Sequence, residues 1–63
     1  MRNLDRIIPI IKQVAKLWYK HPDLRFFQFI IVIAEQFEKE TGINSFYIED
    51  DILLKCLEKA NEI

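Results

Sequence analysis

Glycine, cysteine and histidine each occur only once in this chain of 63 residues, and proline occurs twice. The single glycine, Gly42, excludes a glycine-rich loop of the kind that cradles phosphate groups. The single cysteine, Cys56, excludes an intrachain disulfide, and the absence of a Cys/His cluster excludes a zinc site. The lone thiol and the lack of a signal-peptide pattern lead us to expect a cytoplasmic protein.

Long hydrophobic runs are also absent. The longest apolar stretch, residues 26–34, is apolar at eight of nine positions and is bounded by Arg25 and Glu35. A membrane-spanning helix needs roughly 20 apolar residues. We therefore expect no membrane span, and the chain length predicts a single domain over residues 1–63.

The formal net charge is only -1, but the two ends of the chain differ in sign. Residues 1–25 carry six Lys and Arg against two carboxylates, whereas residues 26–63 carry three Lys against eight carboxylates. Such a bipolar chain can attract a neighbouring copy of itself. The overall balance argues against nucleic acid as its main partner.

Apolar spacing predicts three helices, so we expect an all-α three-helix bundle. The first helix is expected to be capped by Asn3 or Asp5 and to end before Pro22, with its apolar residues on an arc of roughly 180°. The second is expected over residues 24–41, with Asp23 as its cap and Gly42 as a left-handed stop. Its apolar arc of roughly 200° predicts that the other two helices sandwich it.

The third helix is expected to begin at Glu49, Asp50 and Asp51, because carboxylates are favoured at the positive end of the helix dipole. A short extended segment, residues 44–48, precedes it. This segment has a strand-like composition but no partner strand within the chain. It either docks on the bundle or pairs with its counterpart across a dimer axis.

The residues that could support catalysis are few. His21 stands between Lys20 and Pro22 at a helix end, where a solvated histidine complements the helix dipole. Cys56 falls on the apolar side of the third helix and is expected to be a small buried hydrophobe. The acidic run at residues 49–51 lacks the alternating ligands of a calcium loop. We expect no enzyme activity, no cofactor and no metal.

Two surfaces are candidates for binding. Aromatic anchors dominate protein interfaces, and the candidate contact residues are Trp18, Phe27, Phe29, Val32 and Tyr47. The chain has more apolar side chains than so small a domain can bury, so we expect a homodimer, or another protein partner, to cover the surplus. The favoured hypothesis is therefore a non-catalytic interaction module. The alternative is a small nucleic-acid-binding regulator that uses a basic face on the first helix, formed by Arg6, Lys12, Lys16, Lys20 and Arg25.

Two separated motifs resemble the YihD-type family of short bacterial and prophage proteins. The first runs from Trp18 through Pro22-Asp23-Leu24 to Gln28-Phe29, and the second comprises Phe46-Tyr47-Ile48-Glu49-Asp50-Asp51-Ile52-Leu53 with Leu57. The resemblance covers about residues 17–58 and departs at the bulky pair Phe26-Phe27. It implies a compact bacterial or phage-borne cytosolic domain and transfers no catalytic residue; the hypothesis of an interaction module includes a regulatory or prophage-encoded role.

Overall fold

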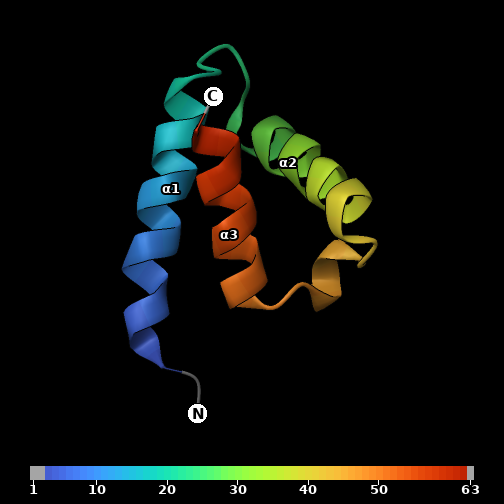
Figure 1. Ribbon diagram of the computed structural model, residues 1–63. Coiled ribbons are helices and arrows are strands. Elements are labelled where there is room, and N and C mark those ends of the chain that lie inside the picture. Colours follow the sequence, from blue (N-terminus) through green and yellow to red (C-terminus); the bar gives the residue numbers. More distant parts are fainter. Residues whose placement is uncertain (1–2, 63) are drawn as a thin grey trace.

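The computed structural model describes residues 3–62 and confirms the all-α fold, with three α-helices among these residues. In chain order, the elements are the 3-10 turn η1 (Leu4–Arg6), α1 (Ile7–Tyr19), α2 (Phe26–Thr41), the 3-10 turn η2 (Ser45–Tyr47) and α3 (Asp50–Asn61). Figure 1 shows their arrangement.

The start of α1 is prepared by a short 3-10 turn. The Asn3 side chain accepts a hydrogen bond of 2.9 Å from the backbone N–H of Asp5, so Asn3 is the cap of this turn. The α-helix proper begins at Ile7, which places Pro9 in the first turn. A first-turn residue needs no backbone donor, so proline is tolerated there.

The second helix begins two residues later than the sequence predicted. Its N-cap is Arg25, whose backbone is extended, and the predicted cap Asp23 lies in the preceding turn. The Gln28 side chain accepts from the Arg25 backbone N–H at 2.9 Å, as in half of a capping box. Leu24 belongs to the same turn, and its backbone N–H donates to the His21 carbonyl. Gly42, with φ 72°, ends α2 as predicted.

The predicted extended segment before α3 contains a 3-10 turn. Asn44 caps this turn by accepting from the Phe46 N–H at 3.0 Å, and the Tyr47 N–H donates to the Asn44 carbonyl at 2.8 Å. Extended backbone remains only beside the turn, as at Ile48. The predicted extended segment is thus interrupted by a 3-10 turn, because the Asn44 side chain offers the backbone a local hydrogen bond. Ile48 packs against the core.

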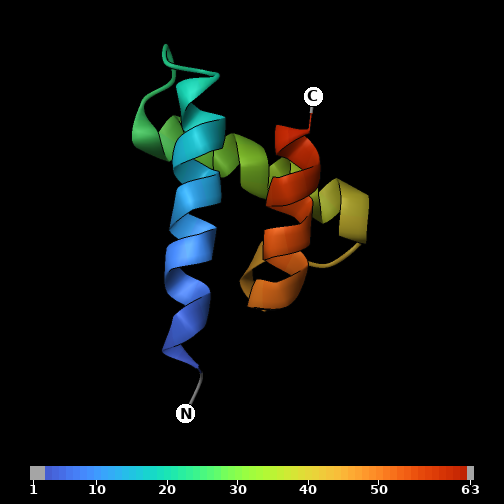
Figure 2. The ribbon, with the colours of Figure 1, turned by 60° about the vertical axis from the view of Figure 1, so that its left-hand side comes forward.

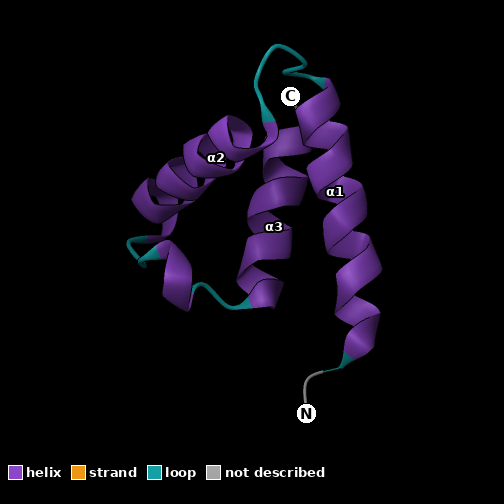
Figure 3. Ribbon diagram, turned by 180° about the vertical axis from the view of Figure 1, so that it is seen from behind, coloured by secondary structure: helices purple, strands orange, loops and turns teal. Residues whose placement is uncertain are grey.

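The third helix begins as predicted, with Glu49 as N-cap and Asp50 and Asp51 in its first turn. It runs beside α1 in the same direction, and this is the closest-packed pair of helices in the fold (Figure 1). In the view of Figure 2, α2 crosses behind both of them. The expectation that α2 is sandwiched was therefore wrong, because α1 and α3 contact each other directly. Figure 3 shows the same arrangement from behind.

The core lies where α2 crosses the α1–α3 pair. Phe29 and Phe37 of α2 are fully buried against Leu17 of α1 and against Cys56 and Leu57 of α3. Burial of each large apolar side chain contributes roughly 1.5–3 kcal/mol. This small cluster therefore holds α2 across the other two helices.

Candidate interaction surface

The first helix is apolar on two faces, of which only one meets the core. Ile10, Val14 and Leu17 face the bundle. On another side, residues spaced four apart form an exposed row, which we call the α1 ridge. The α1 ridge consists of Ile7, Ile11, Ala15 and Tyr19, and Leu4 and Ile8 lie exposed near its N-terminal end.

The C-terminal end of the α1 ridge leads to a group of rings that we call the aromatic corner, namely Trp18, Phe26 and Phe27. The ring centroids of Trp18 and Phe26 are 5.3 Å apart, and those of Phe26 and Phe27 are 5.5 Å apart. Trp18 also stacks on buried Phe29 at 5.9 Å. The corner therefore links the core to the surface, where Phe27 is 75% exposed.

Trp18 is fixed in this position by a polar contact. Its indole Nε1 donates to the Leu24 carbonyl at 2.9 Å, across the turn that joins α1 and α2. A half-buried tryptophan of this kind presents an apolar ring while its N–H is satisfied. The aromatic corner is therefore tied to the turn and is preorganised for contact.

On α2, Phe27 begins a row that continues at Ile31 and Glu35, all exposed and spaced four residues apart, which we call the α2 ridge. Val32 is not part of this row: it is turned about 140° from Phe27 and about 100° from Ile31, toward the Gln36 side of α2. It borders a separate groove of about 390 Å³. That groove is lined by Leu17, Lys20, His21, Leu24, Phe29, Val32, Ile33, Gln36, Phe37 and Ala60.

The structure places the five predicted contact residues in different environments. Phe29 is 0% exposed, so its assignment to a surface was wrong: the same apolar period that marks a contact residue also marks a core residue. Trp18 and Phe27 come together in the aromatic corner. Val32, 49% exposed, and Tyr47 are accessible but lie apart from it.

Tyr47 belongs to a small second patch. Its ring packs edge-on against Phe46, with centroids 5.1 Å apart, and Phe46 is 85% exposed. The turn η2, which carries both residues, lies near the C-terminal end of α2 (Figure 1). Of the predicted segment, Ile48 therefore docks on the bundle while the two rings face outward.

Sequence reasoning missed the α1 ridge, although a signal was present. The first helix carries more apolar residues than one buried face requires, and those at positions 7, 11, 15 and 19 recur every four residues. Phe26 and Ile31 were likewise not singled out. Periodicity showed that these residues share a side of a helix, but it could not show which side the bundle would cover.

The predicted basic face is divided by the fold. Lys12 and Lys16 are exposed in neighbouring turns of α1, and Arg25 is exposed in the turn before α2. Lys20 donates to the Asn61 carbonyl at 2.9 Å, at the C-terminal end of α3. Arg6 forms an ion pair with Asp50. Two of the five cations are thus committed to contacts between α1 and α3.

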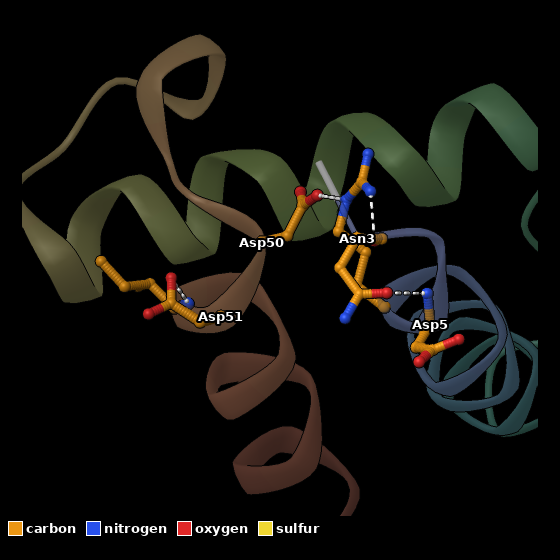
Figure 4. A network of polar contacts seen from close by, with 6 residues as sticks. Asn3, Asp5, Asp50 and Asp51 are labelled. Atoms are coloured by element: carbon orange, nitrogen blue, oxygen red, sulfur yellow. Dashed lines mark hydrogen bonds and ion pairs between the residues drawn. The ribbon is translucent and has the colours of Figure 1, made fainter. Parts of the chain in front are cut away.

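Figure 4 shows a polar network at the N-terminal ends of α1 and α3, with Asn3, Asp5, Asp50 and Asp51 labelled. The Arg6 guanidinium donates from Nε to the Asp50 carboxylate and from Nη1 to the Asn3 carbonyl at 2.6 Å. The Asp51 carboxylate accepts from the Ile52 N–H at 2.9 Å. Two members of the acidic run therefore serve the local structure of the helix start.

The residues that were considered for catalysis or metal binding occupy ordinary positions in the fold. His21 is exposed, and its backbone N–H donates to the Trp18 carbonyl at 2.9 Å. Cys56 is buried as predicted. Burial first, and the Glu40 charge second, raise the pKa of the Cys56 thiol, against an opposing effect of Lys59. Within residues 3–62, no group of three or more His, Cys, Asp and Glu side chains is placed to hold a metal ion.

None of the described helices has the length and apolar character needed to cross a membrane. The chain matches no protein-family model, no curated protein and no solved structure. The candidate surface therefore has to be interpreted from its own chemistry.

Proposed function

We propose that this protein is a non-catalytic, self-associating helical module, which acts in the cytosol, in a regulatory or prophage setting. The α1 ridge, the aromatic corner and the α2 ridge together form its contact surface. The observation that carries the proposal is the amount of apolar surface that one copy leaves in water.

The total exposed area supports a partner. The chain exposes 5208 Å² of surface. A compact monomer of 7.6 kDa exposes about 4,300 Å² by the usual scaling of area with mass. The excess, roughly 900 Å², is close to the ~800 Å² that each partner contributes to an interface of standard size. The radius of gyration, 11.5 Å, is also larger than the ~10.6 Å expected for this length.

The apolar side chains on the proposed contact surface account for an area of the same size. A large apolar side chain exposes about 200 Å² when fully accessible. On that basis the exposed fractions of these side chains, with those of the neighbouring Leu4 and Ile8, give about 1,000 Å², whereas the largest apolar patch of a typical monomer is about 300–600 Å². The side chains that contribute to this area are Leu4, Ile7, Ile8, Ile11, Tyr19, Phe26, Phe27 and Ile31.

The nucleic-acid alternative gains no support from the fold. Arg6 and Lys20 are engaged with α3, and the exposed Lys12 and Lys16 border the apolar α1 ridge. A phosphate backbone would have to be bound beside uncovered isoleucines. A protein partner could contact both Lys12 and Lys16 and the apolar α1 ridge. We therefore propose protein binding as the function.

Sedimentation velocity between about 1 and 100 µM tests the proposal. We expect the wild-type chain to sediment as a dimer and Ile11→Asp to sediment as a monomer, because the carboxylate would be desolvated in the interface. Val32→Asp is the matched control: it makes the same kind of change at a similarly exposed position outside the contact surface. A monomeric wild-type chain at 100 µM would refute self-association.

A further inference from the structure

We infer that the occupant of this surface is a second copy docked reciprocally, with the α1 ridge of each copy packed on the α2 ridge of the other. The inference rests on the proposed function and adds which helices meet. It follows from the charges beside the two ridges and from the corner that joins them.

The charges of α1 disfavour its pairing with itself. The charged residues of α1 are Lys12 and Lys16, with no carboxylate between Ile7 and Tyr19. Both lysines are exposed and flank the α1 ridge. Packing α1 against α1 of a second copy in antiparallel fashion would bring lysines of the two chains together on one flank. Like charges in an interface oppose association.

The charges of α2 complement those of α1. On the α2 ridge, Phe27 and Ile31 are followed by the exposed carboxylate Glu35 and then, at the same spacing, by Lys39, while α2 as a whole carries three carboxylates against one lysine. An α1 ridge laid on it would bury Ile11 and Ala15 against Phe27 and Ile31. It would also bring Lys12 or Lys16 within reach of Glu35. Opposite charges beside an apolar centre are the usual arrangement of a specific interface.

The row spacing of the two ridges suits such packing. Both ridges repeat every four residues, and rows of this kind interdigitate when helices cross at about 50°. Within one copy, the Trp18–Phe26–Phe27 rings join the C-terminal end of the α1 ridge to the N-terminal end of the α2 ridge. A two-fold axis through this aromatic corner exchanges the two copies, so the contact between one α1 ridge and the partner's α2 ridge is repeated by its symmetry equivalent and the dimer is closed.

Charge reversal tests the arrangement. One variant carries Lys12→Glu and Lys16→Glu, and the other carries Glu35→Lys. Alone, each variant sets like charges against each other in both contacts, so we expect its dimer dissociation constant to rise about tenfold. In an equimolar mixture, every contact of the heterodimer again joins opposite charges. We therefore expect mixing to restore dimers at wild-type concentrations.

The matched control is Lys55→Glu, which reverses a charge on the exposed side of α3, away from both ridges. It should dimerise as the wild-type chain does, and far-ultraviolet circular dichroism should show that all variants remain folded. Raising the salt to about 0.5 M should shrink the differences, because exposed charges are screened.

The outcomes separate this inference from the proposed function. A dimeric wild type with an unaffected Glu35→Lys variant would overturn reciprocal packing and leave self-association standing. Reciprocal packing would likewise be overturned if the double lysine variant paired more strongly with the wild-type chain than with Glu35→Lys. A monomeric wild type would overturn both proposals together.

Discussion

The α1–α3 pair and the crossing helix α2 share one apolar core, but the α1–α3 pair is tied in addition by polar contacts between its helices. Polar contacts tie α1 to α3 at both ends of α3, through the Arg6–Asp50 ion pair at one end and Asn61 at the other. Helix α2 is held by burial of Phe29 and Phe37 and by the stacking of Trp18 on Phe29. The first arrangement sets the register of two helices, and the second places α2 across them by apolar packing.

This difference bears on the proposed contact surface. The α1 ridge lies on the polar-anchored pair, and the α2 ridge lies on the helix held by apolar packing. Reciprocal docking of a second copy would brace each α2 against a second α1. We therefore expect changes in the apolar attachment to have the largest effects, and changes in the polar ties to have smaller ones.

The largest effect is expected for Phe29→Ala. Truncation of a fully buried phenylalanine costs about 3–5 kcal/mol, because it loses apolar burial and leaves a cavity. Chemical unfolding followed by circular dichroism measures this loss. Since the truncated chain could unfold altogether, Phe29→Leu provides a milder test with an expected cost of about 1.5 kcal/mol or less. An unchanged midpoint for both variants would contradict the anchoring role of Phe29.

A smaller loss is expected for Asn61→Ala. The Asn61 amide Nδ2 donates to the Gln13 carbonyl at 3.0 Å and to Gln13 Oε1 at 2.8 Å. Its Oδ1 is buried without a hydrogen-bond partner, which offsets part of the gain from the two donations. We therefore expect a loss of about 1–2 kcal/mol, read from thermal unfolding. Glu58→Ala, at an exposed position on the same helix, should change stability by less than about 0.5 kcal/mol.

The Arg6–Asp50 ion pair is expected to contribute less than about 1 kcal/mol, because both side chains are about one-third exposed. A double-mutant cycle with Arg6→Ala and Asp50→Ala isolates the coupling. Its value should fall in high salt, where the charges are screened. A coupling above about 2 kcal/mol would contradict the small contribution expected of a partly exposed ion pair.

The smallest effect concerns Cys56. Because burial raises its pKa in the folded chain, the fold favours the neutral thiol. Any stability from this preference is present below the thiol's unfolded pKa, about 8.5, and is lost as pH rises toward the folded value. At pH 7 we expect alkylation by iodoacetamide to be slow in the folded chain and to become fast in denaturant. Equal rates in both conditions would contradict burial of Cys56.

Much of the local structure was predictable because its signals are local. Gly42 ends α2 in the left-handed conformation, and Asp50 and Asp51 open α3, as their chemistry predicts. The start of α2 was misplaced because Asp23 is a good cap in isolation, whereas the structure uses residues 21–24 for a turn that meets Trp18. Burial of Cys56 followed from its position on the apolar side of α3.

The candidate surface was only partly predictable. Trp18 and Phe27 were identified by residue type, but Phe29 has the same composition signal and lies in the core. The α1 ridge was overlooked because α2 was expected to lie between the other two helices. With α1 packed beside α3 instead, a second apolar row of α1 is left in water.

The sequence by itself determined three helices and their polar and apolar sides. It also determined the end of α2 and the start of α3, because these depend on residues within one or two turns of each other. Only the tertiary structure decided that α1 and α3 run in parallel and that α2 crosses them. The choice of which apolar rows are buried depends on contacts between residues far apart in the chain, such as Arg6 with Asp50 and Gln13 with Asn61. A helical period shows that a face is apolar, but neighbouring helices determine whether water reaches it.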